Sequence, residues 1–104
     1  MADTPAPDFD YQSIDEVIHG RVRLAIMAYL SGAGSADFME LKQRAGANDG
    51  NLSVHLRKLE EAGYISIEKR FAGKRPQTLC HLSPAGREAW IAYIGHIQSL
   101  LAGG

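Results

Sequence analysis

The chain has a single cysteine and no long apolar segment, and these two features argue against a disulfide-stabilised protein and a membrane protein. The lone Cys80 excludes an intramolecular disulfide and fits a reducing compartment, so a cytoplasmic location is expected. No run approaches the ~18 apolar residues of a membrane span, so no membrane partner is expected. The N-terminus has no basic stretch before an apolar one, which argues against a signal peptide.

Catalytic and metal-ligating patterns are also missing. The sequence holds no Ser-His-Asp arrangement, no paired carboxylates and no phosphate-cradling glycine loop, so we expect neither an enzyme nor a cofactor. Three histidines, His19, His55 and His96, belong to different predicted elements. Cys80 and His81 are neighbours on a predicted strand and therefore face opposite sides of it. No metal site is expected, and Cys80 is interpreted as a small buried hydrophobe.

Charge is nearly balanced, but its distribution along the chain is uneven. The formal net charge of 104 residues is −1, and the length fits a single domain. Residues 1–20 contain five acidic residues and no Lys or Arg, whereas residues 69–75 contain four Lys or Arg and no acid. A phosphate responds to charges within a Debye length of ~10 Å, so this local basic patch outweighs the average.

The apolar spacing and the capping residues predict three helices before the basic patch. After a loose acidic arm at residues 1–12, the domain at residues 13–104 opens with a helix from 13 to about 31, capped by Ser13 with Glu16. A short helix at 38–45 follows, with Asp37 as its cap and Gly46 as its stop. A third helix, capped by Asn48, runs to about residue 62 and ends at Gly63.

The hydrophobic period then changes from 3.6 to 2, which predicts a β-hairpin. Ile65, Ile67 and Phe71 alternate with polar residues, a turn is expected over residues 72–77, and Thr78, Cys80 and Leu82 form one face of the second strand. A short strand at 35–37 is expected to pair with this hairpin. Ser83-Pro84 starts a last helix over residues 84–101. The predicted class is therefore α+β, a winged helix-turn-helix with an extra C-terminal helix.

The third helix has one apolar edge and one polar face, as a DNA recognition helix has. With Leu52, Leu56 and Leu59 buried, the opposite face carries the candidate DNA-binding residues Asn51, Ser53, Val54, Arg57 and Lys58. Asn51 and Val54 suit base edges, whereas the others suit phosphates. The hairpin adds Arg70, Lys74 and Arg75. His55 lies beside the buried edge and is interpreted as structural, packing on the hairpin or the second helix.

Three other interpretations stay open beside this one. A solvated polar face on an amphipathic helix is common, and a charged loop can lack a partner altogether. A winged helix can also serve as a protein-interaction module, because a fold does not fix a function. The cluster of cations on the hairpin favours duplex DNA, since an interaction module has no need of it.

The last helix is apolar over more than half of its circumference. One small core cannot cover all of these residues, so we expect a symmetric homodimer through this helix. Extra packing against the first helix of the same chain is the alternative. The candidate interface residues, which include positions spaced as in a helix–helix seam, are Trp90, Ile94, Ile97 and Leu101.

Residues 52–65, L-S-x-H-L-x-x-L-E-x-x-G-Y-I, are followed by the basic hairpin and by L-S-P-A-G-R at 82–87. Over about residues 14–101 the chain resembles the small one-domain winged-helix transcriptional regulators related to the MarR and ArsR classes. The resemblance implies a homodimer that binds duplex DNA at a palindromic operator. It departs from ArsR-type metal sensors, which often carry a cysteine pair on the recognition helix. It also leaves little room for the effector cleft of larger MarR proteins, which argues against a small-molecule effector.

Overall fold

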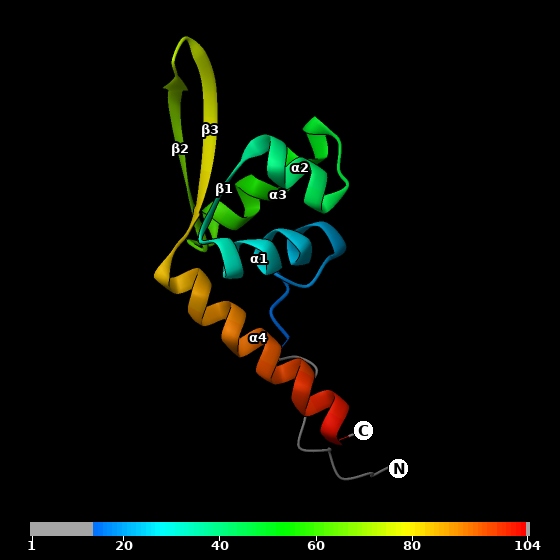
Figure 1. The fold of residues 1–104 in the computed structure, drawn as a ribbon. Helices are drawn as coiled ribbons and strands as arrows, with labels where there is room; N and C mark the ends of the chain where they lie inside the picture. Colours follow the sequence, from blue (N-terminus) through cyan, green and yellow to red (C-terminus); the bar gives the residue numbers. More distant parts are fainter. Residues whose placement is uncertain (1–13, 104) are drawn as a thin grey trace.

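The computed structural model of the protein describes residues 14–103, and its elements build a winged helix. The helices are α1 (Arg21–Ala33), α2 (Phe38–Ala45), α3 (Asp49–Glu61) and α4 (Pro84–Gly103), and the strands are β1 (Ser35–Asp37), β2 (Ile65–Ala72) and β3 (Arg75–Leu82). Figure 1 shows α1, α2 and α3 packed together, the β2–β3 hairpin projecting from one end of the molecule and α4 pointing away from the other. The predicted fold class is confirmed. The predicted arm at 1–12 and the Ser13 cap lie outside the described residues.

The core lies between the first three helices, with α1 at its centre. Ile26, Met27 and Leu30 of α1 are fully buried. The third helix contributes the three leucines predicted from its spacing, Leu52, Leu56 and Leu59, all buried. Complete burial of one such side chain stabilises the fold by about 1.5–3 kcal/mol. The buried edge of α3 is thereby fixed, and its opposite face is left to solvent.

The first helix begins at Arg21, so the predicted start at residue 13 is wrong. The preceding segment forms a separate turn, in which the Asp15 carboxylate accepts hydrogen bonds from the amides of Val17 and Ile18 at 2.8 and 3.3 Å. Gly20 is then extended, with φ 176°. The apolar spacing predicted the wrong start because Ile18, although its side chain is fully buried in the core, belongs to this turn and not to a helix.

The ends of α2 and α3 follow the predicted caps. The Asp37 carboxylate accepts from the Glu40 amide at 2.8 Å, and the Glu40 carboxylate accepts from the Asp37 amide at 3.2 Å, which completes a capping box. The Asn48 side chain accepts from the Asn51 amide at 2.8 Å at the start of α3. By contrast, α1 continues slightly beyond its predicted end, to Ala33. Each cap satisfies a helix amide that otherwise has no partner.

The three strands form an antiparallel sheet in the order β1-β3-β2. Residues 35–37 pair with residues 79–81, which confirms the short strand. Cys80 is fully buried, as predicted, and this burial, together with nearby carboxylates, raises the pKa of its thiol to about 11. His81 points to the other face of the sheet, where its Nε2 lies 2.9 Å from a carboxylate oxygen of Glu68. Cys80 is therefore a packing residue.

The hairpin is longer and its turn tighter than predicted. Ala72 pairs with Arg75, so the turn consists of Gly73 and Lys74 alone, and the predicted turn over residues 72–77 is wrong. Gly73 adopts φ +67°, a conformation that costs glycine little. Pro76 is accommodated within β3 because β1 does not extend that far and leaves this edge of the strand unpaired.

The last helix begins as predicted and touches the body between Gly86 and Ile97, whereas its last residues are exposed. The Ser83 hydroxyl accepts from the Gly86 amide at 2.9 Å. A Cβ at Gly86 would overlap the carbonyl oxygen of Tyr64, so the first turn of α4 lies directly on the junction between α3 and β2. Tyr93 is the other buried residue of α4. Across residues 14–103, none of the helices combines the length and apolar character needed to cross a membrane.

Candidate nucleic-acid interface

All five candidate residues of α3 are exposed to solvent. Asn51, Ser53, Val54, Arg57 and Lys58 lie outside the core, whereas the three leucines of the same helix are buried. Val54 is an apolar side chain with 44% of its surface exposed. An exposed β-branched residue lowers helix propensity slightly and adds nothing to the core, so packing does not explain its presence here.

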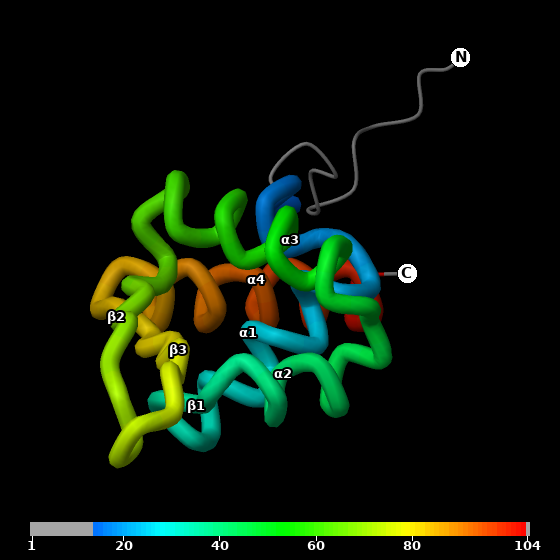
Figure 2. The backbone as a smooth tube through the Cα atoms, turned by 90° about the horizontal axis from the view of Figure 1, so that it is seen from above, coloured from blue at the N-terminus to red at the C-terminus, as the bar shows by residue number. Residues whose placement is uncertain are grey.

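The exposed residues of α3 divide into two groups. Ser53 and Arg57 line a pocket beside the β2–β3 hairpin, which we call the wing. Lys58 lines another pocket together with Glu16 and Arg23 from the segment around the start of α1. In Figure 2, seen from above, α3 crosses the molecule with the hairpin to one side of it. Arg57 and Lys58, adjacent in sequence, therefore border different pockets. The sequence pattern placed both on the face opposite the leucines, and both are exposed there.

The cations of the wing are divided by the alternation of the strands. Lys69 shares a face with Ile67 and Cys80, the face that is turned toward the helices. Arg70 lies on the opposite face, where its Nε donates to Gln77 Oε1 at 3.4 Å. Lys74 occupies the turn and Arg75 opens β3, and both are exposed. Positive charge thus borders the wing on both faces and at its tip.

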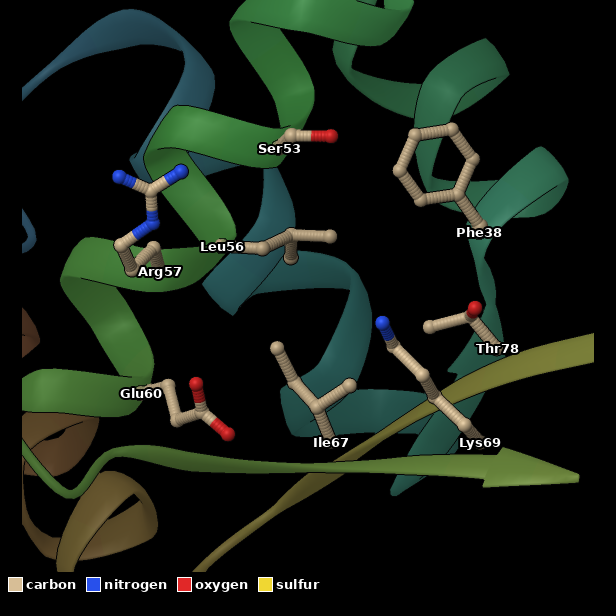
Figure 3. A pocket seen from close by; sticks show the side chains of 8 residues that line it. All are labelled: Phe38, Ser53, Leu56, Arg57, Glu60, Ile67, Lys69 and Thr78. Atoms are coloured by element: carbon tan, nitrogen blue, oxygen red, sulfur yellow. The ribbon is translucent and has the colours of Figure 1, made fainter.

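A pocket of about 490 Å³ separates α3 from the wing. Figure 3 shows Phe38 and Lys69 reaching into it, Leu56 and Ile67 forming its base, and Arg57 pointing away. Sequence reasoning missed Phe38, Thr78 and Lys69 as members of this surface. The period-2 alternation already puts Lys69 on the face of Ile67, and that signal could have identified it.

The third helix, α3, is tied to the rest of the protein at several points. An Arg23 guanidinium nitrogen lies 2.9 Å from His55 Nδ1, and the Arg23 Nε donates to the Val17 carbonyl oxygen at 2.5 Å. His55 is therefore structural, as predicted, but its partner is Arg23 of α1, not the wing or α2. Because an arginine can only donate, His55 accepts through Nδ1 and is neutral. Burial, and then the charges of Arg23 and Lys58, lower the pKa of His55.

Further contacts brace both ends of α3. Lys42 Nζ of α2 and the Asp49 carboxylate form an ion pair of 2.7 Å across the turn that joins the two helices. Beyond the C-terminus of α3, the Tyr64 hydroxyl donates to the Asp15 carboxylate, and this bond raises the pKa of Tyr64 to about 12. The exposed face of α3 is consequently presented by a rigid support.

The predicted interface residues of α4 have different surroundings. Trp90, Ile94 and Ile97 are partly buried against the core of their own chain, whereas Leu101 is 76% exposed. Sequence reasoning missed Ile91, 64% exposed, on the outer side of the helix. No group of three or more His, Cys, Asp or Glu residues close enough to hold a metal ion occurs in the described part of the chain.

Comparison with known proteins agrees with this architecture. The sequence profile of a family described as winged helix DNA-binding domain matches residues 22–101. The chain belongs to this family. The match covers α1 through most of α4, including the helix-turn-helix and the wing. The protein is thus a winged-helix DNA-binding regulator and not an enzyme, as predicted, and its resemblance to winged-helix regulators related to MarR is confirmed.

Three relatives illustrate the match. An uncharacterized protein of Methanocaldococcus jannaschii is 35% identical over 85 residues, which are 82% of this chain and 92% of that protein. A transcriptional regulator homologue from Pyrococcus horikoshii is 26% identical, with a TM-score of 0.80 over 86% of this chain and 88% of the other. The transcriptional repressor BigR from Xylella fastidiosa is 28% identical, with a TM-score of 0.58 over 76% and 74% of the two chains.

Proposed function

We propose that the protein is a sequence-specific transcriptional regulator that binds duplex DNA as a homodimer. In this proposal α3 enters the major groove, and the β2–β3 wing contacts the backbone or the minor groove. The main support is the exposed face of α3, which combines base-reading and phosphate-binding side chains next to a basic hairpin. The names of two relatives, a transcriptional regulator homologue and a transcriptional repressor, point the same way.

The chemistry of α3 fits this placement. Asn51 and Val54 lie in its N-terminal half, where an asparagine can bond adenine bidentately and a valine can contact a thymine methyl group. Arg57 and Lys58 follow on the exposed part of the helix and border different pockets, one beside the wing and one beside the start of α1. That separation suits contacts with phosphates on the two strands that border one groove.

A binding experiment tests the proposal. Duplexes are selected from random DNA with the full chain, and affinities are measured for the selected site, its single-base variants and unrelated DNA. Asn51→Ala should lose discrimination at one base position per half-site, by about 1–3 kcal/mol. Lys74→Ala should weaken every duplex alike and lower the salt slope by about one for each phosphate that is no longer neutralised. If no duplex is enriched and affinity does not respond to salt, the protein-interaction module is the better assignment.

The dimer part of the proposal is supported by exposed apolar residues of α4. Ile91 and Leu101, less than a quarter turn apart around the helix, are both exposed large hydrophobic residues, although α4 is well formed. A second α4 would remove this surface from water, and the symmetry of a twofold dimer would place two copies of α3 on one side of a duplex. Sedimentation equilibrium of Ile91→Lys should show a shift toward monomer, whereas Ala92→Lys, exposed on a different side of the same helix, should not. An unchanged dimer in Ile91→Lys, or a wild type that is already monomeric at tens of micromolar, would place this surface outside any interface.

A further inference from the structure

The tip of the wing carries an aromatic side chain that the fold does not use. Phe71 is 70% exposed, although it shares its strand face with the buried Ile65 and with Ile67. The helices cover only the base of the hairpin, so the alternation that buries Ile65 leaves Phe71 in solvent at the other end. A single exposed hydrophobic residue is ordinary on a protein surface. The residues around Phe71, however, distinguish it from a scattered surface hydrophobe.

The surroundings of Phe71 are rigid and positively charged. It pairs across the hairpin with Pro76, whose ring restricts the opposite strand, and the turn beyond it has only Gly73 and Lys74. Lys69 precedes it on the same face of the strand. From residue 69 to residue 82 the sequence has four Lys or Arg and no acidic residue. An aromatic ring held between cationic side chains is the combination expected of a surface that contacts stacked bases and the phosphates on either side of them.

We propose that Phe71, supported by Pro76, is an apolar wedge that contacts base edges in the minor groove and bends the duplex. This inference rests on the proposed function and adds a role that the charged residues cannot supply. Architectural DNA-binding proteins insert side chains such as Phe, Met and Pro between base steps, and the resulting kinks are about 20–90°. The cations at the tip bind the phosphates on either side, while Phe71 selects steps that unstack easily, such as TA or CA.

Two variants separate the wedge from the charges. Phe71→Ala removes the ring and no charge, and Lys74→Ala removes a charge and leaves the ring. Energy transfer between dyes at the two ends of a selected duplex measures the bend, and titrations over a range of salt concentrations measure affinity and its salt slope. Phe71→Leu serves as a third variant, because leucine can also act as a wedge. Phe71 is exposed, so all three variants should keep the thermal stability of the wild type, which is checked first.

We expect Phe71→Ala to reduce the bend, to bind about tenfold more weakly and to keep the salt slope. Phe71→Leu should retain part of the bend. Lys74→Ala should lower the salt slope and keep the bend. If Phe71→Ala binds and bends the duplex as the wild type does, the wedge is refuted and the DNA-binding function stands. If the wild type binds no duplex, both proposals fall, and Phe71 is then better explained as a contact with a protein partner.

Discussion

The third and fourth helices use their apolar residues in opposite ways. In α3, Leu52, Leu56 and Leu59 are all buried, and the rest of the helix is exposed apart from the half-buried His55. Val54 is the one large apolar residue among the exposed positions of this helix. The longer α4 is more apolar in sequence, yet only Gly86 and Tyr93 are buried. When the apolar residues of a helix are the ones that are buried, the helix needs no partner beyond its own chain. When a helix has more apolar residues than its own chain buries, the remaining apolar surface is available to a partner.

The largest expected effect compares a residue from each helix. Leu59→Ala should lower the free energy of unfolding by about 2–5 kcal/mol, because it leaves a cavity in the core. Ile91→Ala should change it by less than about 0.5 kcal/mol at protein concentrations where the chain is monomeric. Urea unfolding followed by circular dichroism at several protein concentrations measures both. Equal losses at the lowest concentration would mean that the outer side of α4 packs within its own chain.

The two ends of α4 can be compared through their glycines. Gly86→Ala should cost about 1–3 kcal/mol or more, because the new methyl group would overlap the Tyr64 carbonyl. Gly95→Ala has open space and should stabilise the helix by about 0.5–1 kcal/mol. Thermal unfolding of both variants tests this contrast. If Gly86→Ala is tolerated as well as Gly95→Ala, the first turn of α4 is not held against the body as described.

Two asparagines at the start of α3 allow an effect on stability to be distinguished from an effect on DNA recognition. Asn48→Ala removes the acceptor for the Asn51 amide and should lower stability by about 1 kcal/mol. Asn51→Ala removes an exposed side chain within the helix and should be neutral or slightly stabilising. Chemical denaturation gives the first comparison, and DNA binding gives the second, in which only Asn51→Ala should lose base discrimination. A stability loss in Asn51→Ala similar to that in Asn48→Ala would contradict this division.

The smallest expected effect concerns the contact that anchors α3 to α1. Neutral His55 accepts a hydrogen bond from Arg23, and burial lowers its pKa below the ordinary value of 6.5. The unfolded chain therefore binds a proton at a higher pH than the folded chain does. Stability is fully present above pH 6.5 and is lost as the pH falls through the folded pKa. His55→Gln should show a weaker loss over this range in pH-dependent unfolding, and an identical loss would assign the effect to other groups.

Local signals predicted most of the central elements. The starts of α2 and α3 agree with the sequence because Asp37 and Asn48 cap them through hydrogen bonds that span only three residues. The predicted start of α1 was wrong because Asp15 closes a separate turn. The Tyr64 hydroxyl, from a distant part of the chain, donates a hydrogen bond to the carboxylate of Asp15. Apolar spacing alone does not distinguish a continuous helix from a turn that buries the same residues.

The sequence by itself determined which elements form and which leucines enter the core, because caps and hydrophobic periods act within a few residues. Tertiary structure decided which neighbouring elements lie beside each charged side chain and which apolar residues stay exposed to water. Arg57 and Lys58 border different pockets because the wing lies on one side of α3 and the start of α1 on the other. Phe71 is exposed because the helices end before the hairpin does, and only the three-dimensional extent of one element against another sets that limit.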